Sequence, residues 1–227
     1  MTIAADNISK EFIRQGRGTN RFIAVKPADI TIEHGKLTLL MGRSGSGKST
    51  LLNMLAGLLA PDSGKVMYGD TDICALDDDR LSDFRMKHIG VVPQGQTAVG
   101  SLTVIENICL SFMIHGTSDE RTAAHIYARE LMSRFGIAEL ENELPSALSG
   151  GELRRMAIAR AMIRKPDVIF ADEPTCDLDD ENTELVLNIL KEAAGNGTSV
   201  FMVSHEKDAA EYADICYSMN AGVISVS

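Results

Sequence analysis

The chain has 227 residues, 44% of them hydrophobic and 24% charged, which suits one large globular domain with its own core. The formal net charge of −10 at pH 7 argues against broad electrostatic capture of nucleic acid, because that needs a basic face. The four cysteines (Cys74, Cys109, Cys176 and Cys216) lack the spacing of a zinc site, so we expect free thiols in a reducing cytosol. The longest apolar run, residues 51–60, is about half of the roughly 20 residues that a membrane span needs. Polar residues near the start also interrupt any secretory signal, so any membrane role is expected to come through a partner.

Strands and helices are predicted to alternate along the chain. Apolar runs that end in turn residues predict strands at 36–42, 65–69, 88–94, 167–172 and 198–205, with a closing hairpin at 215–227. Helical spacing and start signals predict helices at 49–59, 103–116, 118–136, 150–165 and 180–195. This alternation predicts an α/β core with a mostly parallel sheet in a single domain over residues 1–227, with a helical insertion at roughly 95–164. The acidic triplet at 77–79 is interpreted as a solvated loop.

Residues 42–49, GRSGSGKS, fit the phosphate-binding pattern G-x-x-x-x-G-K-[ST] between a predicted strand and a predicted helix. Glycines let successive backbone N–H groups face inward, and the helix adds its positive N-terminal end. A lysine at this place supplies a charge to the β- and γ-phosphates, and the following serine hydroxyl can bind Mg²⁺. The residues expected to contact the nucleotide are Gly42, Arg43, Ser44, Gly45, Ser46, Gly47, Lys48, Ser49 and Thr50.

Two further segments contain motifs that can bind a cation or an anion, one with adjacent acidic residues and one with adjacent glycines. The run VIFADEPT (168–175) delivers Asp172 to the carboxyl end of a buried strand, where it can hold Mg²⁺, and Glu173 follows in place to orient a water. Taken alone, this pair would also suit a solvated strand end. The segment LSGGE (148–152) forms a second anion-friendly turn at a helix start, although by itself it also suits an ordinary helix cap. Two such loops in one chain suggest a head-to-tail dimer in which each copy's LSGGE covers the other's γ-phosphate.

The ordered set GRSGSGKS, VVPQ, LSGGE, VIFADEPT, CDLD and MVSH resembles the ATP-binding cassette (ABC) family over essentially the whole chain. Within that family the chain is similar to the ATPase subunits of lipoprotein-release and macrolide-export systems. The resemblance implies a P-loop NTPase core with a mostly parallel sheet, an N-terminal antiparallel β subdomain and an inserted helical subdomain. It implies ATP and Mg²⁺ as cofactors. It also implies a second ATPase subunit, which we expect to be an identical copy, with a related cassette as the alternative. It also implies a cytoplasmic position on the inner face of the membrane, through an integral membrane permease subunit.

The resemblance also implies roles for single residues. Gln94 matches a glutamine that contacts Mg²⁺ and the attacking water, and His205 matches a histidine that bonds the γ-phosphate. Asp179 matches an aspartate that communicates across the dimer. Phe12 matches the aromatic residue that stacks on adenine, with Phe22 as the alternative. The catalytic set is therefore Glu173, His205, Gln94 and Lys48, the metal set is Ser49, Gln94 and Asp172, and the dimer contributes Ser149, Gly150, Gly151, Glu152 and Asp179.

The chain departs from the usual family pattern in a few places. Glu152 replaces a commoner glutamine and adds a negative charge near the partner's phosphates, with the contacts of Ser149 expected to be unaffected. The following LRR replaces QQR, Cys176 replaces a small residue, and Phe12 replaces a commoner tyrosine. None of these changes removes a catalytic group, so ATP hydrolysis is expected.

Three functions remain open from the sequence. The first is the motor of a transporter, docked through a groove at about 94–115, with Val99, Leu102, Ile105 and Ile108 either lining the groove or packing in the core. The second is an ATPase that regulates a membrane partner without moving a solute, as the cell-division type does. The third, a soluble ATPase of DNA repair or translation, is disfavoured because the chain has no long coiled coil, second cassette or basic surplus.

Overall fold

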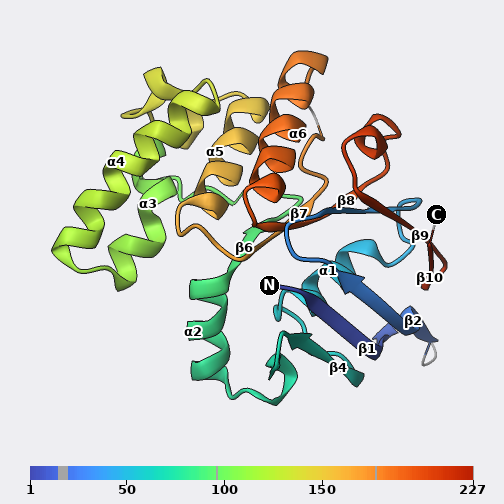
Figure 1. The fold of residues 1–227 in the computed structure, drawn as a ribbon. Coiled ribbons are helices and arrows are strands. Elements are labelled where there is room, and N and C mark those ends of the chain that lie inside the picture. Colours follow the sequence, from blue (N-terminus) through green and yellow to red (C-terminus); the bar gives the residue numbers. More distant parts are fainter. Residues whose placement is uncertain (15–19, 96, 177, 227) are drawn as a thin grey trace.

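The structure is a computed structural model that describes residues 1–14, 20–95, 97–176 and 178–226 (Figure 1). Its larger sheet has six strands, in the order β10 (Val223–Val226), β9 (Ile215–Asn220), β3 (Leu37–Met41), β8 (Ser199–Ser204), β7 (Val168–Asp172) and β6 (Ile89–Val92). All neighbours in this sheet are parallel except β10 and β9, which form the predicted closing hairpin. The mostly parallel core sheet is therefore confirmed.

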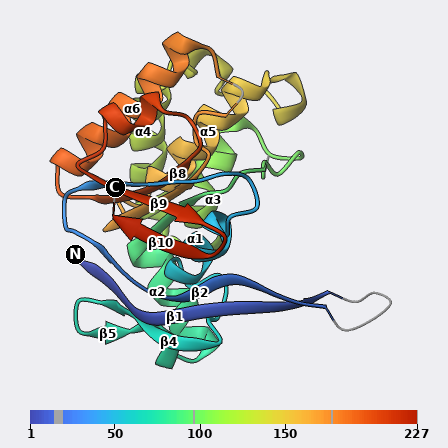
Figure 2. The ribbon, with the colours of Figure 1, turned by 90° about the vertical axis from the view of Figure 1, so that its right-hand side faces the viewer.

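The smaller sheet is antiparallel and lies below the first in Figure 1. Its order is β2 (Asn20–Ile32), β1 (Ile3–Arg14), β4 (Ser63–Tyr68) and β5 (Thr71–Asp72). Strands β1 and β2 continue beyond the body of the molecule as a two-stranded ribbon, which is seen edge-on in Figure 2. This sheet is the N-terminal antiparallel subdomain that the resemblance implies.

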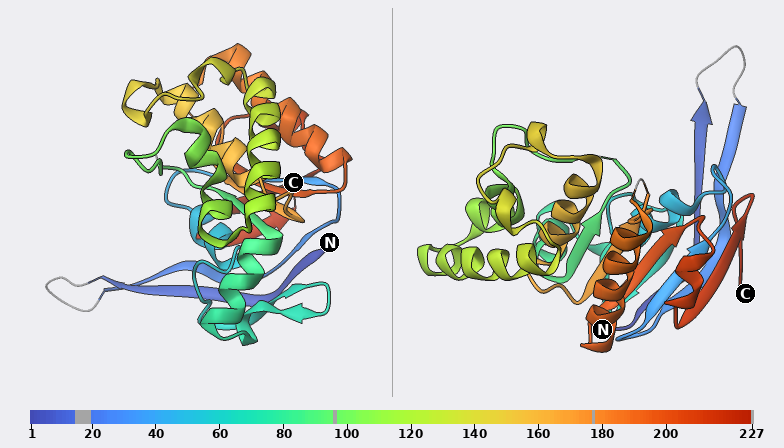
Figure 3. Two further views of the ribbon diagram at one scale, coloured as in Figure 1. Left: turned by 90° about the vertical axis from the view of Figure 1, so that its left-hand side faces the viewer. Right: turned by 90° about the horizontal axis from the view of Figure 1, so that it is seen from above.

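Helices separate into two groups around the large sheet (Figure 3). Helix α1 (Lys48–Leu55) packs between the two sheets, and α2 (Asp78–His88) lies beside the small sheet. On the other face of the large sheet lie α5 (Gly150–Met162) and α6 (Asp180–Gly195), and α3 (Val104–His115) and α4 (Ser118–Arg134) pack against α5 on its far side. Short 3₁₀ helices occur at Ile73–Ala75, Ala138–Leu140, Pro145–Ala147 and Asp208–Glu211. Among the described residues, no helix is both long and apolar enough to cross a bilayer.

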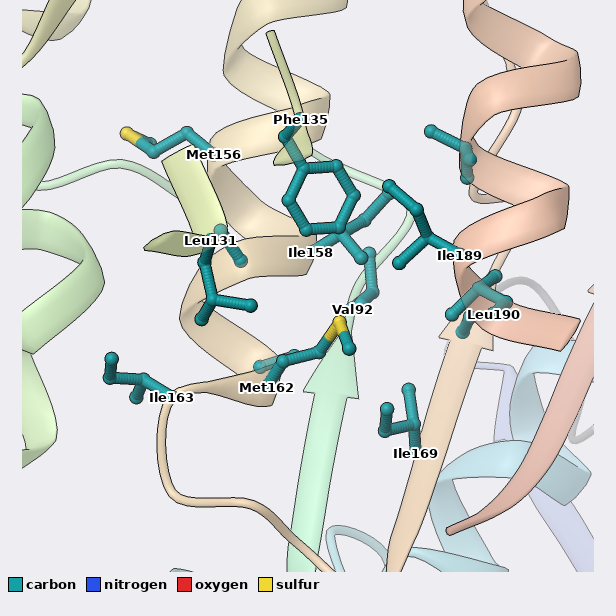
Figure 4. Packing of buried hydrophobic residues seen from close by; sticks show 14 of the residues in the cluster. Val92, Leu131, Phe135, Met156, Ile158, Met162, Ile163, Ile169, Ile189 and Leu190 are labelled. Carbon is teal, nitrogen blue, oxygen red and sulfur yellow. The ribbon is translucent and has the colours of Figure 1, made fainter. Parts of the chain in front are cut away.

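The large sheet is apolar on both faces, which explains why its strands are continuous hydrophobic runs in the sequence. Successive side chains of a strand point to opposite faces, so Ile169 packs with the helical side while Phe170 packs toward α1 and the small sheet. Figure 4 shows the helical side, where Val92 and Ile169 from the strands meet side chains of α4, α5 and α6. The site residues that follow these strands are therefore held by a core on each side.

One expectation about local structure was wrong, and for two residues of the expected docking groove core packing is the correct one of the two alternatives. The triplet at 77–79 is not a loop, because Asp77 caps α2 by accepting a hydrogen bond from the Arg80 N–H, and Asp78 and Asp79 fill its first turn. In the expected docking groove, Ile105 and Ile108 belong to the core, being 5% and 0% exposed. Only Val99, at 38% exposure, is an exposed apolar side chain of that set.

Candidate active site

The phosphate-binding loop joins β3 to α1, where its backbone must turn sharply. Gly47 has φ +109° immediately before the helix, and a Cβ at this residue would lie 2.1 Å from the Ala24 carbonyl oxygen. The loop is fixed to β10's turn by a 3.0 Å hydrogen bond from the Gly222 N–H to the Ser46 carbonyl. Strands β2 and β10 thus hold the loop from outside, and only glycine fits where β2 approaches.

Lys48 folds back over the loop that precedes it. Its amine donates hydrogen bonds to the carbonyl oxygens of Gly42, at 2.8 Å, and Arg43, at 3.3 Å. The residue is only 7% exposed, so burial and these two bonds hold its charge beside the loop. A fixed ammonium next to inward-facing N–H groups is suited to binding phosphate.

An open cavity of about 710 Å³ adjoins this loop. It collects residues from five separated parts of the sequence: the β2 strand, the phosphate-binding loop, the end of β6, the end of β7 and the end of β8. They are Phe22, Ala24, Arg43, Ser44, Gly45, Gly47, Lys48, Ser49, Thr50, Gln94, Glu173, Cys176 and His205. The structure therefore brings together four predicted catalytic residues, Lys48, Gln94, Glu173 and His205.

Asp172 ends β7, directly before Glu173, and is not among the residues that line the cavity. It is 6% exposed, and its Oδ1 atom has no hydrogen-bond partner among the residues that the structure describes. Burial raises the pKa of this carboxyl, while its interaction with the Ser49 hydroxyl lowers it. A buried carboxylate oxygen without a partner is costly, so this position is suited to a positive ligand.

Glu173 has a left-handed backbone with φ +51°, which is rare for a residue with a Cβ. A 2.9 Å hydrogen bond from its N–H to the Val203 carbonyl on β8 holds that conformation. Strain of this kind costs about 1–3 kcal/mol and persists where surrounding structure enforces it, commonly at functional sites.

The Glu173 side chain contacts two other predicted catalytic groups. Its Oε2 is 2.8 Å from Nδ1 of His205, and its Oε1 is 3.8 Å from the Lys48 amine. This distance is that of a hydrogen bond between the carboxyl group and the imidazole. The carboxylate is buried, whereas the imidazole of His205, which also lines the cavity, is 59% exposed.

Gln94 follows β6 and is positioned by a residue that sequence reasoning gave no role. The Arg154 guanidinium on α5 donates one hydrogen bond to the Pro93 carbonyl and one to the Gln94 carbonyl, each at 2.8 Å. Arg160, two turns later, donates to the Thr97 carbonyl at 2.8 Å. In the sequence, the LRR segment was noted only as a departure, and no local pattern could indicate a contact about 60 residues away.

The LSGGE segment and Asp179 form a different surface. Together with their neighbours they line a second cavity of about 440 Å³, whose residues are Ser149, Gly150, Gly151, Arg155, Leu178, Asp179 and Asn182. Ser149 caps α5 and Asp179 caps α6, and Arg155 joins the two helices through a 2.5 Å hydrogen bond to Asn182. Asp177 of the CDLD motif lies outside the described residues. Most of the predicted site residues therefore fall into two groups, one lining each cavity, while Phe12, Gly42, Ser46, Glu152 and Asp172 line neither.

The two candidates for the adenine contact face each other across β1 and β2. Phe12 and Phe22 are direct cross-strand partners, and they are 39% and 41% exposed. Phe22 lines the first cavity, while the Lys10 amine lies 5.9 Å from the Phe12 ring centre. Because directly opposed residues project from the same face of a sheet, both rings are presented on one side of the ribbon.

Comparison with known proteins agrees with this geometry. The family model described as ABC transporter matches residues 25–176. The ATP-binding protein LolD of the lipoprotein-releasing system of Myxococcus xanthus is 36% identical over 90% of this chain and 89% of its own length. The macrolide export ATP-binding/permease protein MacB of a Shewanella species is 34% identical over 91% of this chain, which spans 32% of that longer protein.

Solved structures give the same result. A dimeric post-hydrolysis state of an ATP-binding cassette, bound to ADP and Pi, matches with a TM-score of 0.88 and 30% identity, covering 99% of this chain and 98% of that one. The predicted fold class, the family and the ATPase activity are therefore confirmed. The chain belongs to the ABC transporter family, as an ATP-binding cassette with ATP hydrolase activity.

Proposed function

We propose that this chain is the ATP-hydrolysing subunit of a membrane transporter and that the first cavity carries the reaction. The observation that supports this most is the contact of Glu173 with both Lys48 and His205 beside the phosphate-binding loop. Lys48 and the loop N–H groups bind the β- and γ-phosphates, and His205 bonds the γ-phosphate. Glu173 orients the attacking water and accepts its proton. Phe12 or Phe22 stacks on the adenine.

The donor set beside the loop also fits Mg²⁺, which prefers oxygen ligands and binds through one or two carboxylates together with phosphates. The Asp172 Oδ1 atom, which has no partner among the described residues, and the nearby Ser49 hydroxyl supply such oxygens, and Gln94 adds an amide oxygen from the cavity wall. In this proposal these three residues hold the ion. When bound, Mg²⁺ neutralises charge on the phosphates.

The second cavity supports assembly of two copies. Ser149, Gly150, Gly151 and Asp179 line a cavity that shares no residue with the one at the phosphate-binding loop of their own chain, and Glu152 lies in the first turn of α5 beside Ser149. We infer that two chains pair head to tail and that each copy's α5 N-terminus covers the other's γ-phosphate. ATP then shifts the equilibrium toward the closed pair only by the amount by which it binds the closed pair more tightly than the open one.

We also infer a membrane partner, since relatives are named for transport systems and one of them joins an ATP-binding part to a permease. On this view the chain lies in the cytoplasm, on the inner face of the cell membrane. Closure and reopening of the pair drive a separate integral membrane subunit.

The test of the reaction is Glu173→Gln. We expect turnover to fall about 10²-fold or more, because the general base is lost, while ATP binding and ATP-dependent dimers remain. Glu192→Gln is the matched control, since this exposed residue of α6 pairs only with Arg134, at 2.8 Å, among the described contacts. The control should hydrolyse ATP at the parent rate. A Glu173→Gln chain as active as the parent would remove Glu173 from the mechanism.

The test of the partner is a pull-down of tagged Glu173→Gln chain, with ATP, from detergent-solubilised membranes of the source cell. Stoichiometric recovery of a membrane-spanning protein would support the transporter, and a flux assay on that protein would then separate transport from regulation without transport. Recovery of only ribosomes, DNA or other non-membrane material, while dimers still form, would contradict the membrane-coupled function.

A further inference from the structure

The Glu152 carboxylate occupies the hydrogen-bonding groups of Ser149. Its Oε2 atom accepts from the Ser149 hydroxyl at 2.8 Å and from the Ser149 N–H at 2.7 Å. In return, the Glu152 N–H donates to the Ser149 Oγ at 3.3 Å. A serine hydroxyl has a single hydrogen, and here that hydrogen points to Glu152. In the single chain, Glu152 therefore engages both the hydroxyl and the N–H of Ser149.

The same arrangement occurs at two other helix starts in this chain. Thr103 with Glu106 opens α3, and Thr117 with Glu120 opens α4, each with a hydroxyl-to-carboxylate distance of 3.0 Å. All three are capping boxes, which stabilise helix ends. Only the third includes a residue, Ser149, that lines the cavity that the proposed function places against a second copy's nucleotide.

Glu152 is an anion in this position. The Ser149 N–H and hydroxyl hold the pKa of its carboxyl below the usual range, so the group is ionised at neutral pH. The γ-phosphate is also an anion, and its oxygens accept hydrogen bonds. The Glu152 carboxylate and the γ-phosphate therefore compete for the single hydrogen of the Ser149 hydroxyl. The two anions also repel each other at short range.

We propose that Glu152 is a positioning residue that acts through Ser149, holding the hydroxyl hydrogen away from the nucleotide of the second copy and so opposing closure of the pair. This inference rests on the proposed head-to-tail assembly. Closure must break the 2.8 Å hydrogen bond or share its hydrogen, and reopening restores it. The closed state is weakened as a result, which favours reopening after hydrolysis.

Glu152→Gln tests this directly, because glutamine keeps a capping box while it removes the charge. In the Glu173→Gln background, the ATP concentration for half-maximal dimer formation is measured by analytical ultracentrifugation. We expect Glu152→Gln to lower that concentration about fivefold to tenfold. The gain should shrink as salt rises, since screening weakens the repulsion that the parent carries.

Glu120→Gln, in the same background, is the matched control, since it changes an equivalent capping box on α4 away from both cavities. It should leave the ATP dependence of dimer formation unchanged. A second comparison uses Ser149→Ala, in which the added Glu152→Gln change should gain only about twofold, because no hydroxyl remains that an amide oxygen would hold less tightly than the carboxylate does.

The outcomes separate the two proposals. An equal or higher ATP requirement in Glu152→Gln, with the parent dimer intact, would overturn the role of Glu152 and leave the assembly standing. If no variant forms an ATP-dependent dimer, the proposed assembly fails and the inference fails with it. A gain of the same size in Glu120→Gln would assign the effect to helix capping and also overturn the inference.

Discussion

At the scale of single residues, the nucleotide site contains left-handed backbone positions that differ in what holds them. Glu173 has φ +51° and is kept there by its hydrogen bond to β8. Gly47 has φ +109° and is limited by space as well, because β2 passes close to its Cα. The glycine pattern in the sequence predicted the loop, but it could not show which glycine faces a strand. Gly45 has φ +77°, and no atom lies within 4 Å of a Cβ built on it.

Gly47→Ala is therefore expected to destabilise the protein far more than Gly45→Ala. Both substitutions carry the left-handed penalty of about 1–2 kcal/mol. Only Gly47→Ala adds a clash with the Ala24 carbonyl, so we expect its total loss to exceed about 3 kcal/mol. Thermal unfolding without nucleotide measures both, and each kcal/mol corresponds to about 2–4 °C at this chain length. Equal unfolding midpoints for the two variants would contradict the close approach of β2.

At the scale of elements, helix starts were predictable where a cap precedes an apolar stripe. The start of α4 was placed correctly at Ser118, and the structure adds Thr117 as its cap. Helix α2 was missed because none of its residues is buried, so its sequence has no apolar period, and its acidic start resembles a loop. Contacts between elements were beyond prediction for a different reason. The two bonds from Arg154 of α5 to the loop after β6 depend on how the helix lies on the sheet.

Loss of the Arg154 contact is expected to affect turnover more than nucleotide binding. Arg154→Ala frees the Gln94 backbone from α5, and a misplaced catalytic group costs rate even when binding persists. We expect turnover at saturating ATP to fall about tenfold, with the affinity for ATP changed less than about twofold. Arg129→Ala is the control, since this exposed arginine pairs with Glu141 outside both cavities. Equal turnover in the two variants would show that α5 does not position Gln94.

At the scale of the whole molecule, the chain has an acidic surplus and holds many carboxylates in place with hydrogen bonds. The fold and the motif residues followed from the sequence because buried strands deliver those residues to one edge of the sheet. The hydrogen bonds of carboxylates to groups far away in the sequence could not be predicted from the sequence, because the partners come together only in the folded chain. Carboxyls whose pKa is lowered in the folded protein are Asp62, Glu106, Glu120, Glu141, Glu152, Asp179 and Asp214.

These lowered pKa values predict that stability is lost in acid. A carboxyl whose folded pKa lies below its unfolded value stabilises the protein above the unfolded value and loses that contribution as pH falls through the folded one. Asp172 contributes to the pH dependence of stability with the opposite sign, because burial raises its pKa. The carboxyls with a lowered pKa outnumber it, so their effect is expected to dominate. We therefore expect the thermal midpoint to fall as pH drops from about 5 to about 3, the range around the ordinary Asp and Glu pKa values.

Asp62, which accepts hydrogen bonds from the Lys10 amine and the Glu11 N–H at 2.7 Å each, offers the control. Asp62→Asn should lower the midpoint at pH 7 and flatten its fall in acid, because the Lys10 hydrogen bond, the main cause of the lowered pKa of Asp62, would no longer join opposite charges. A parent midpoint that stays level or rises between pH 5 and pH 3 would contradict the prediction and assign the larger effect to relief of the negative surplus.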